Sequence, residues 1–258
     1  MTITKKIIHT RNSNHSRKYN NKHKRKTPAK TPAKTEIEFE GRILNIDPAE
    51  LQKKLRMIGG YRKSPLTLYR RSVFNLCDIK RGFVRVRDEG DKITMTAKIY
   101  KNPDFPEEYE LNLDQGKTFE NGQEFLRALN LTEKAYHETI REKWSIPRRN
   151  GTELCEVAID YIPGLPVYAE LECKSERDLK RVCKMLNVQY KDLTFGGYGK
   201  VYVEYYGMAE NDINNIIPKL TFQNIKSEIS KYIHKNTEIL DKAFTDNMTI
   251  YEKVKGKS

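Results

Sequence analysis

Charged side chains recur at every second position in several short segments between residues 38 and 172, with mostly apolar residues between them. Arg85 and Arg87 enclose a valine, and Glu170 and Glu172 enclose a leucine. Because side chains two residues apart in a strand lie on one face, each segment predicts a strand with one charged face and one largely apolar face. Since acidic and basic segments interleave and helical stretches are available to cover the apolar faces, we favour a barrel that is charged inside and apolar outside.

The predicted charged face carries both signs in nearly equal number. Its acidic candidates are Glu38, Glu40, Glu108, Glu110, Asp160, Glu170 and Glu172. Its basic candidates are Arg42, Arg85, Arg87, Lys98, Arg141 and Lys143. An unpaired ion in a dry interior costs on the order of tens of kcal/mol, so the interior must be wet, internally paired or occupied by ions. The alternative is an ordinary sheet with solvated cross-strand ion pairs, each contributing roughly 0.2–1 kcal/mol.

These residue types are suited to one kind of chemistry. Carboxylates supply hard oxygen ligands for Mg²⁺ or Mn²⁺, which typically use few protein ligands together with phosphate oxygens. Arginine and lysine neutralise the remaining phosphate oxygens, and arginine can do so with two parallel hydrogen bonds. Phosphoryl transfer depends mainly on positioning and charge stabilisation, which metals and a ring of cations provide.

Periodicity and capping signals predict an α+β order of elements. Strands are expected near 36–46, 67–75, 82–88, 92–100, 107–113, 137–146, 153–161 and 167–174, and helices after Asp47, near 118–129 and near 176–187. Residues 199–206 form either a further strand or a short helix, isoleucine spacing from about 209 onward predicts helical packing, and the last dozen residues are expected to be loose.

The N-terminal 34 residues hold eleven of the 48 lysines and arginines and no acidic residue, which predicts a disordered polybasic tail. The cluster Lys22–Lys26 is suited to nucleic-acid contact or a nuclear address, although a merely solubilising tail remains open. No apolar run approaches a membrane span and no secretion signal is recognisable, so a cytoplasmic protein is expected. The four cysteines form no CxxC pair, which favours reduced thiols over disulfides or zinc.

The order of these motifs resembles the CYTH superfamily, also called triphosphate tunnel metalloenzymes. Glu38-Phe39-Glu40-Gly41-Arg42 is similar to the family's Glu-x-Glu-x-Lys signature, with arginine in place of lysine. Arg85-Val86-Arg87 resembles its Arg-x-Arg strand, and the segment ending at Lys98 resembles the strand that follows. The 161–166 segment and the Phe195–Tyr198 segment resemble the class IV adenylyl cyclase-like branch. The resemblance covers about residues 36–222.

The resemblance implies an antiparallel eight-stranded β-barrel, the triphosphate tunnel, with helices packed outside. The expected domains are the tail 1–34, the tunnel domain 35–222 and a C-terminal helical extension 223–258. The resemblance implies that Mg²⁺ or Mn²⁺ is bound by Glu38, Glu40, Glu170 and Glu172. It implies that phosphate is bound by Arg42, Arg85, Arg87, Lys98, Arg141 and Lys143, and that the tunnel is also lined by Glu108, Glu110 and Asp160. The implied catalytic residues are Glu38, Glu40, Arg42, Lys98 and Asp160. Because arginine stays charged, a mechanism that needs a neutral amine at Arg42 is in question.

Three functions follow from this resemblance and stay open. The first is a metal-dependent phosphohydrolase acting on a nucleoside triphosphate, inorganic triphosphate, thiamine triphosphate or the 5′-triphosphate end of an RNA. The second is an adenylyl cyclase that forms cyclic AMP and pyrophosphate. The third is a non-catalytic module that binds polyphosphate or RNA, aided by the tail. Both a monomer and a homodimer remain compatible with the sequence.

Overall fold

The computed structural model of the protein describes residues 39–102, 105–113 and 116–256. The predicted tail 1–34 and the predicted ligand Glu38 lie outside these residues, so the expectations for them stay predictions. No helix in the described ranges has the length and apolar character that crossing a membrane requires.

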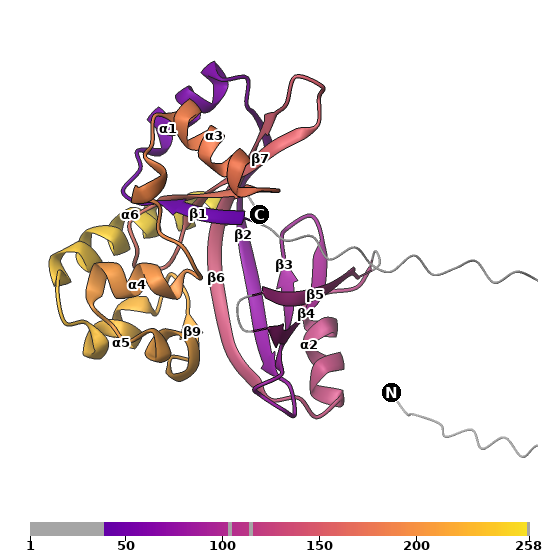
Figure 1. Ribbon diagram of the computed structural model, residues 1–258. Coiled ribbons are helices and arrows are strands. Elements are labelled where there is room, and N and C mark those ends of the chain that lie inside the picture. The colour runs from indigo at the N-terminus through magenta and orange to yellow at the C-terminus, as the bar shows by residue number, and fades with distance from the viewer. Residues whose placement is uncertain (1–38, 103–104, 114–115, 257–258) are drawn as a thin grey trace, which may run out of the picture. The chain divides into compact units, whose positions relative to one another are not determined.

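A single twisted sheet organises the fold (Figure 1). Its strands are β1 (Phe39–Ile43), β2 (Tyr61–Asn75), β3 (Gly82–Asp88), β4 (Ile93–Asn102), β5 (Phe105–Asn112), β6 (Glu133–Pro147), β7 (Glu153–Tyr161), β8 (Tyr168–Cys173) and the short β9 (Lys219–Leu220). Eight strands pair antiparallel in the order β1-β8-β7-β6-β2-β3-β4-β5, and β9 pairs parallel with β6. The long strands β2 and β6 pair along most of their length and join the two halves of the sheet. The α+β class and the eight-stranded antiparallel path are therefore as predicted.

The predicted closure of this sheet into a barrel is wrong for the described chain. The path ends at β1 and at β5, and the described residues of these two strands do not pair with each other. The edge of β1 that does not pair with β8 is instead bridged by the later segment of the chain around Thr194. The backbone N–H of Arg42 donates to the carbonyl of Thr194 at 2.9 Å, and the N–H of Thr194 donates back at 3.0 Å. Because this bridge occupies the backbone N–H and carbonyl of Arg42 on that edge, β5 cannot pair with β1 at Arg42.

Two helices cover the apolar face of β7 and β8 (Figure 1). Helix α1 (Pro48–Met57) begins where the Asp47 carboxylate accepts hydrogen bonds from two backbone N–H groups, at 2.8 and 3.0 Å, and proline occupies the first helical position. Helix α3 (Glu176–Leu186) is capped by Ser175. Buried leucines of both helices pack on the same apolar layer as Leu171, which has no exposed surface. Helices therefore cover the outside of the sheet, as predicted.

The remaining helices cover other parts of the sheet. Helix α2 (Phe119–Ala128) packs on β3 through an apolar cluster around Phe74 and Val86. Helices α4 (Gly199–Tyr206), α5 (Ile225–Ile229) and α6 (Thr237–Lys255), with a π-helical turn at Asp212–Ile216 and short 3₁₀ turns at Tyr190–Asp192 and Ser230–Tyr232, form the C-terminal part.

The expectation of a loose C-terminus is wrong. Helix α6 continues to Lys255, and its residue Tyr251 is 4% exposed and stacks on Phe222 with ring centroids 5.1 Å apart. Apolar contact with β2 and β6 orders this segment, because the aromatic pair buries surface that a loose end would leave in water. The division at residue 222 stays a prediction, and one apolar cluster contains residues from both sides of it.

Candidate active site

Cross-strand register brings the predicted site residues whose side chains the structure describes to one face of the sheet. Residues directly opposite each other in paired strands have their side chains on the same face. Arg42 lies opposite Glu170, Glu170 opposite Ala158, and Ala158 opposite Lys143, so one row crosses four strands. The further opposite pairs on this face are Glu40 with Glu172, Glu172 with Glu156, Arg141 with Asp160, Arg87 with Thr94, Arg85 with Thr96, Thr96 with Glu110, and Lys98 with the backbone position of Glu108.

This face, called the charged face below, has two halves of opposite character. The charged residues that β1, β7 and β8 contribute are mainly carboxylates, whereas Arg71, Arg85, Arg87 and Lys98 of β2, β3 and β4 are cations, and β5 adds Glu110 at the far edge. Strand β6 lies between the halves and carries Arg141 and Lys143. A ligand spanning the face would therefore meet acidic oxygens at one end and cationic nitrogens at the other.

Three buried charges of the acidic half form a network with Arg141 of β6, whose side chain is 19% exposed. The Glu170 carboxylate accepts hydrogen bonds from Arg42, at 2.5 Å, and from Arg141, at 3.3 Å. Arg141 donates two further bonds to Asp160, each 2.6 Å long, in the bidentate geometry that favours guanidinium–carboxylate pairs. Arg42 also donates to the Gly196 carbonyl and, at 3.3 Å, to Glu40. Asp160 has no exposed surface and Arg42 is 4% exposed, so these ions are compensated by one another and not by solvent.

The pKa values of these acids differ because their surroundings differ. Burial and the nearby Glu170 charge raise the pKa of Glu40, despite the opposing charge of Arg42. Burial alone would raise the pKa of Glu170, but the charges of Arg141 and Arg42 outweigh it and lower that pKa. Burial, assisted by the Glu170 charge, raises the pKa of Asp160. The acidic half is therefore a place where additional positive charge would be stabilised.

In the basic half, the predicted cations Arg85, Arg87 and Lys98 share the charged face. Arg85 Nε lies 3.4 Å from the Thr96 hydroxyl, which donates at 2.9 Å to Glu110. The Nε atoms of Arg87 and of its cross-strand neighbour Arg71 are both buried without a hydrogen-bond partner in the described part of the chain. Buried guanidinium donors of this kind are what an oxyanion would satisfy.

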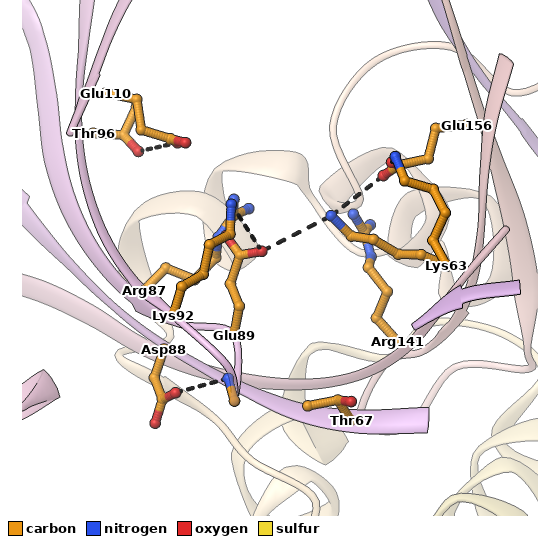
Figure 2. Close-up of polar contacts among 12 residues, drawn as sticks. Lys63, Thr67, Arg87, Asp88, Glu89, Lys92, Thr96, Glu110, Arg141 and Glu156 are labelled. Atoms are coloured by element: carbon orange, nitrogen blue, oxygen red, sulfur yellow. Dashed lines mark hydrogen bonds and ion pairs between the residues drawn. The ribbon is translucent and has the colours of Figure 1, made fainter. Parts of the chain in front are cut away.

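The two halves meet at a cluster around Glu89 (Figure 2). The Glu89 carboxylate lies 2.6 Å from Arg87 and 3.8 Å from both Lys92 and Lys143. Lys143 in turn lies 3.3 Å from Glu156. The Glu89 side chain is only 2% exposed, although the residue belongs to the turn between β3 and β4.

The sequence-based set missed Glu89, Glu156 and Arg71. Glu156 could have been found by extending the alternation of β7 back from Asp160, and Glu89 by extending that of β3 past Arg87. The Asp-Glu-Gly-Asp segment reads as a solvated turn, which hid Glu89. Arg71 has an arginine directly before it, so alternation alone does not decide which of the two lies on the charged face.

His137 and Tyr198 border the charged face. His137 is 6% exposed, its Nδ1 lies 2.8 Å from the Tyr198 hydroxyl, and burial holds its pKa well below the ordinary value of 6.5. Arg71 lies over the Tyr198 ring, 4.6 Å from its centroid. A neutral histidine bonded to a tyrosine agrees with the structural role that a strand histidine more often has.

The predicted divalent cation fits part of this site. Glu40 and Glu172 are cross-strand neighbours with hard oxygen donors, whereas Glu170 is committed to two arginines. Within the described ranges, no three acidic, histidine or cysteine side chains are grouped so that they could hold a metal ion. The donor set therefore suits a Mg²⁺ or Mn²⁺ ion bound by one or two carboxylates together with phosphate oxygens, and it does not suit an all-protein cage.

No protein-family model matches this sequence, and no curated protein matches it. Several solved structures, however, match this chain. A proposed adenylate cyclase from Vibrio parahaemolyticus is 11% identical with a TM-score of 0.52, and the match covers 65% of this chain and 98% of that one. A conserved hypothetical protein from Pyrococcus furiosus is 17% identical, with a TM-score of 0.46 and coverage of 61% and 95%. A proposed adenylyl cyclase from Hippeastrum, described as having a dominant triphosphatase activity, is 16% identical, with a TM-score of 0.42 and coverage of 64% and 93%.

At these identities the likeness is one of fold. The Vibrio match spans almost all of that protein, so the sheet and its helices correspond to a whole domain there. The chain and the Vibrio protein share a fold, which agrees at the level of the fold with the resemblance drawn from the sequence.

Proposed function

We propose that the protein is a metal-dependent phosphohydrolase that binds a triphosphate along the charged face of its sheet. The observation that carries the proposal is the division of that face into an acidic and a basic half that meet at β6. A triphosphate needs cations for its oxygens, and a bridging divalent ion needs carboxylates beside them. A sheet stabilised only by solvated ion pairs would not need Arg42, Asp160 and Glu170 to be buried.

Each half has a distinct role in this proposal. Arg85, Arg87, Lys98 and Lys143 bind phosphate oxygens, and Arg87 retains an unused buried donor for this purpose. Glu40 and Glu172 would hold Mg²⁺ or Mn²⁺, which supplies charge neutralisation and activation of the attacking water when bound. Arg42 within the acidic half and Arg141 at the boundary of the halves, which Glu170 and Asp160 orient, present fixed positive charge.

An adenylyl cyclase is the second candidate. The observation that favours it is the fold shared with the proposed adenylate cyclase from Vibrio parahaemolyticus. The same face would bind ATP, with the ribose 3′-oxygen attacking the α-phosphorus and pyrophosphate leaving. The non-catalytic module is the third candidate, and it predicts triphosphate binding without any product.

Product analysis tests these functions together. The full chain is incubated with Mg²⁺ or Mn²⁺ and inorganic triphosphate, ATP, thiamine triphosphate or a 5′-triphosphorylated RNA, and phosphate, pyrophosphate and cyclic AMP are quantified. The proposal expects phosphate release from at least one substrate. Cyclic AMP with pyrophosphate would identify the cyclase instead, and binding without any product would identify the non-catalytic module.

A pair of arginine variants ties activity to the charged face. Arg87→Met should lower the rate of phosphate release by about 10²–10³-fold, the loss typical of removing one donor that stabilises developing charge. Arg127→Met is the matched control, because Arg127 lies on α2, is about half exposed and pairs with Glu133 at 2.7 Å, away from the charged face. Equal rates for the two variants would contradict the proposed site.

A further inference from the structure

The Glu89 carboxylate lies where three cations of different strands and turns converge. Arg87 comes from the end of β3, Lys92 from the β3–β4 turn, and Lys143 from β6 across the sheet. Two of these cations, Arg87 and Lys143, belong to the proposed phosphate-binding set. In Figure 2, Glu89 lies beside Arg87 and Lys92, and Lys63, Arg141 and Glu156 lie across the site from it.

The geometry around Glu89 suits a larger anion better than a carboxylate. Of the three contacts only that with Arg87, at 2.6 Å, is close, and Glu89 Oε1 still has no hydrogen-bond partner of suitable geometry among the described residues, while both lysines stop at 3.8 Å. The Nε atom of Arg87 is buried and has no hydrogen-bond partner among the described residues. A phosphate group offers three oxygens and more negative charge than the two oxygens of Glu89, so it would use donors that Glu89 leaves unused.

The backbone that carries Glu89 is held in place. The Glu89 N–H donates to the Lys92 carbonyl at 2.9 Å, and Gly90 has a φ of +89°. A Cβ atom at Gly90 would lie 2.5 Å from the Thr67 side chain, so the turn packs closely on β2. Because the backbone of the turn is held, any displacement of the Glu89 carboxylate must come from rotation about its side-chain bonds.

We infer that Glu89 is a resident anion of the phosphate cradle, and that an incoming triphosphate takes its place between Arg87 and Lys143. The inference rests on the proposed function and adds a built-in competitor to it. In the absence of substrate, Glu89 supplies a counter-charge for the largely buried Arg87 and a second acidic neighbour, beside Glu156, for Lys143. When a triphosphate binds, Glu89 must give up these contacts, so it weakens substrate binding while keeping the cradle assembled.

Binding of inorganic triphosphate to the full chain tests this inference. It is measured by calorimetry in chelator-containing buffer at fixed ionic strength, so that no turnover occurs. Glu89→Gln should bind at least about tenfold more tightly than the unchanged protein, which corresponds to about 1.4 kcal/mol. Glu120→Gln is the matched control, because it removes the same charge from an exposed residue of α2 whose partner, Arg70, is 3.3 Å away on the opposite face. Both variants retain the N-terminal residues, so any contribution of these to binding cancels.

A double-mutant cycle shows whether the gain arises in the cradle. The tighter binding of Glu89→Gln should disappear when Arg87 is also changed to Met, because Glu89 and the triphosphate then no longer compete for the Arg87 guanidinium. A persistent gain in that background would overturn the inference. So would equal or weaker binding by a folded Glu89→Gln protein, since Glu89 would then position the cations and not compete with the ligand.

A second variant of Glu89 and a comparison of binding with hydrolysis complete the test. If circular dichroism shows that Glu89→Gln does not fold, Glu89→Asp replaces it, because aspartate retracts the carboxylate by one methylene. Glu89→Asp should bind triphosphate more tightly than the unchanged protein. Equal or weaker binding by Glu89→Asp would again overturn the inference. Triphosphate bound with the expected Glu89 effect but never hydrolysed would refute the hydrolase and leave the inference standing. Hydrolysis of triphosphate, with no effect of the Glu89 variants on binding, would support the hydrolase and overturn the inference about Glu89.

Discussion

Replacing Glu170 by glutamine should destabilise the protein strongly, because Glu170 joins two buried arginines. Its carboxylate accepts bonds from Arg42 at 2.5 Å and from Arg141 at 3.3 Å, and the residue is 8% exposed. Removing one partner of a buried ion pair costs about 3–5 kcal/mol. Arg141 keeps both bonds to Asp160, and Arg42 keeps a weaker contact with Glu40, so we expect a loss near the lower end, about 3 kcal/mol.

The size of this loss should depend on pH. Because the pKa of Glu170 is lowered in the folded protein, its stabilising contribution is present above the ordinary value of 4.5 and is lost as the pH falls through the lowered value. The difference in unfolding free energy between the unchanged protein and Glu170→Gln should therefore be largest near neutral pH and should narrow in acid. Urea denaturation followed by circular dichroism at neutral and acidic pH measures both quantities.

A surface pair provides the control for this experiment. Glu176→Gln removes the same charge from an exposed ion pair with Lys180, 2.8 Å apart on α3, and should leave the unfolding free energy nearly unchanged. A loss below about 1 kcal/mol for Glu170→Gln, the size typical of an exposed pair, would refute the buried network. A difference that stays constant between neutral and acidic pH would refute the assignment of the lowered pKa to Glu170.

Three further outcomes follow from the packing and from His137. Leu171→Ala should lower the unfolding free energy in urea by about 2–5 kcal/mol, because Leu171 is fully buried between the sheet and its helices; a smaller loss would contradict the layer under α1 and α3. Tyr251→Ala should lower the unfolding free energy by about 3–5 kcal/mol in the same assay, and an unchanged unfolding free energy would indicate that the C-terminus is loose. Below pH 6.5 the unfolded chain takes up a proton on His137 that the buried ring does not take up, so the melting temperature should fall as the pH drops below 6.5. His137→Gln should flatten this part of the plot of melting temperature against pH. An unchanged slope in the variant would contradict a neutral His137 ring.

Local elements were largely predictable from the sequence because their signals are local. The alternation of charged and apolar residues marked β3 at 82–88 and β7 at 153–161 with the bounds that the structure shows. The Asp47 and Ser175 caps marked the starts of α1 and α3. Strand period and cap chemistry depend on neighbouring residues only, so they can be recognised in the sequence before any contact is known. The gathering of the charged residues on one face followed from the same alternation.

What could not be predicted depends on contacts between residues far apart in the chain. Alternation does not reveal that Arg42 donates to Glu170, 128 positions later, or that the Thr194 segment bridges the edge of β1 and leaves the barrel open. The contact between Glu89 and Lys143, at 3.8 Å, likewise joins residues that are far apart in the sequence. Strand period assigns each side chain to a face, whereas strand pairing, edge contacts and helix docking decide which charges meet, because those choices are made by distant segments that compete for the same backbone and side-chain partners.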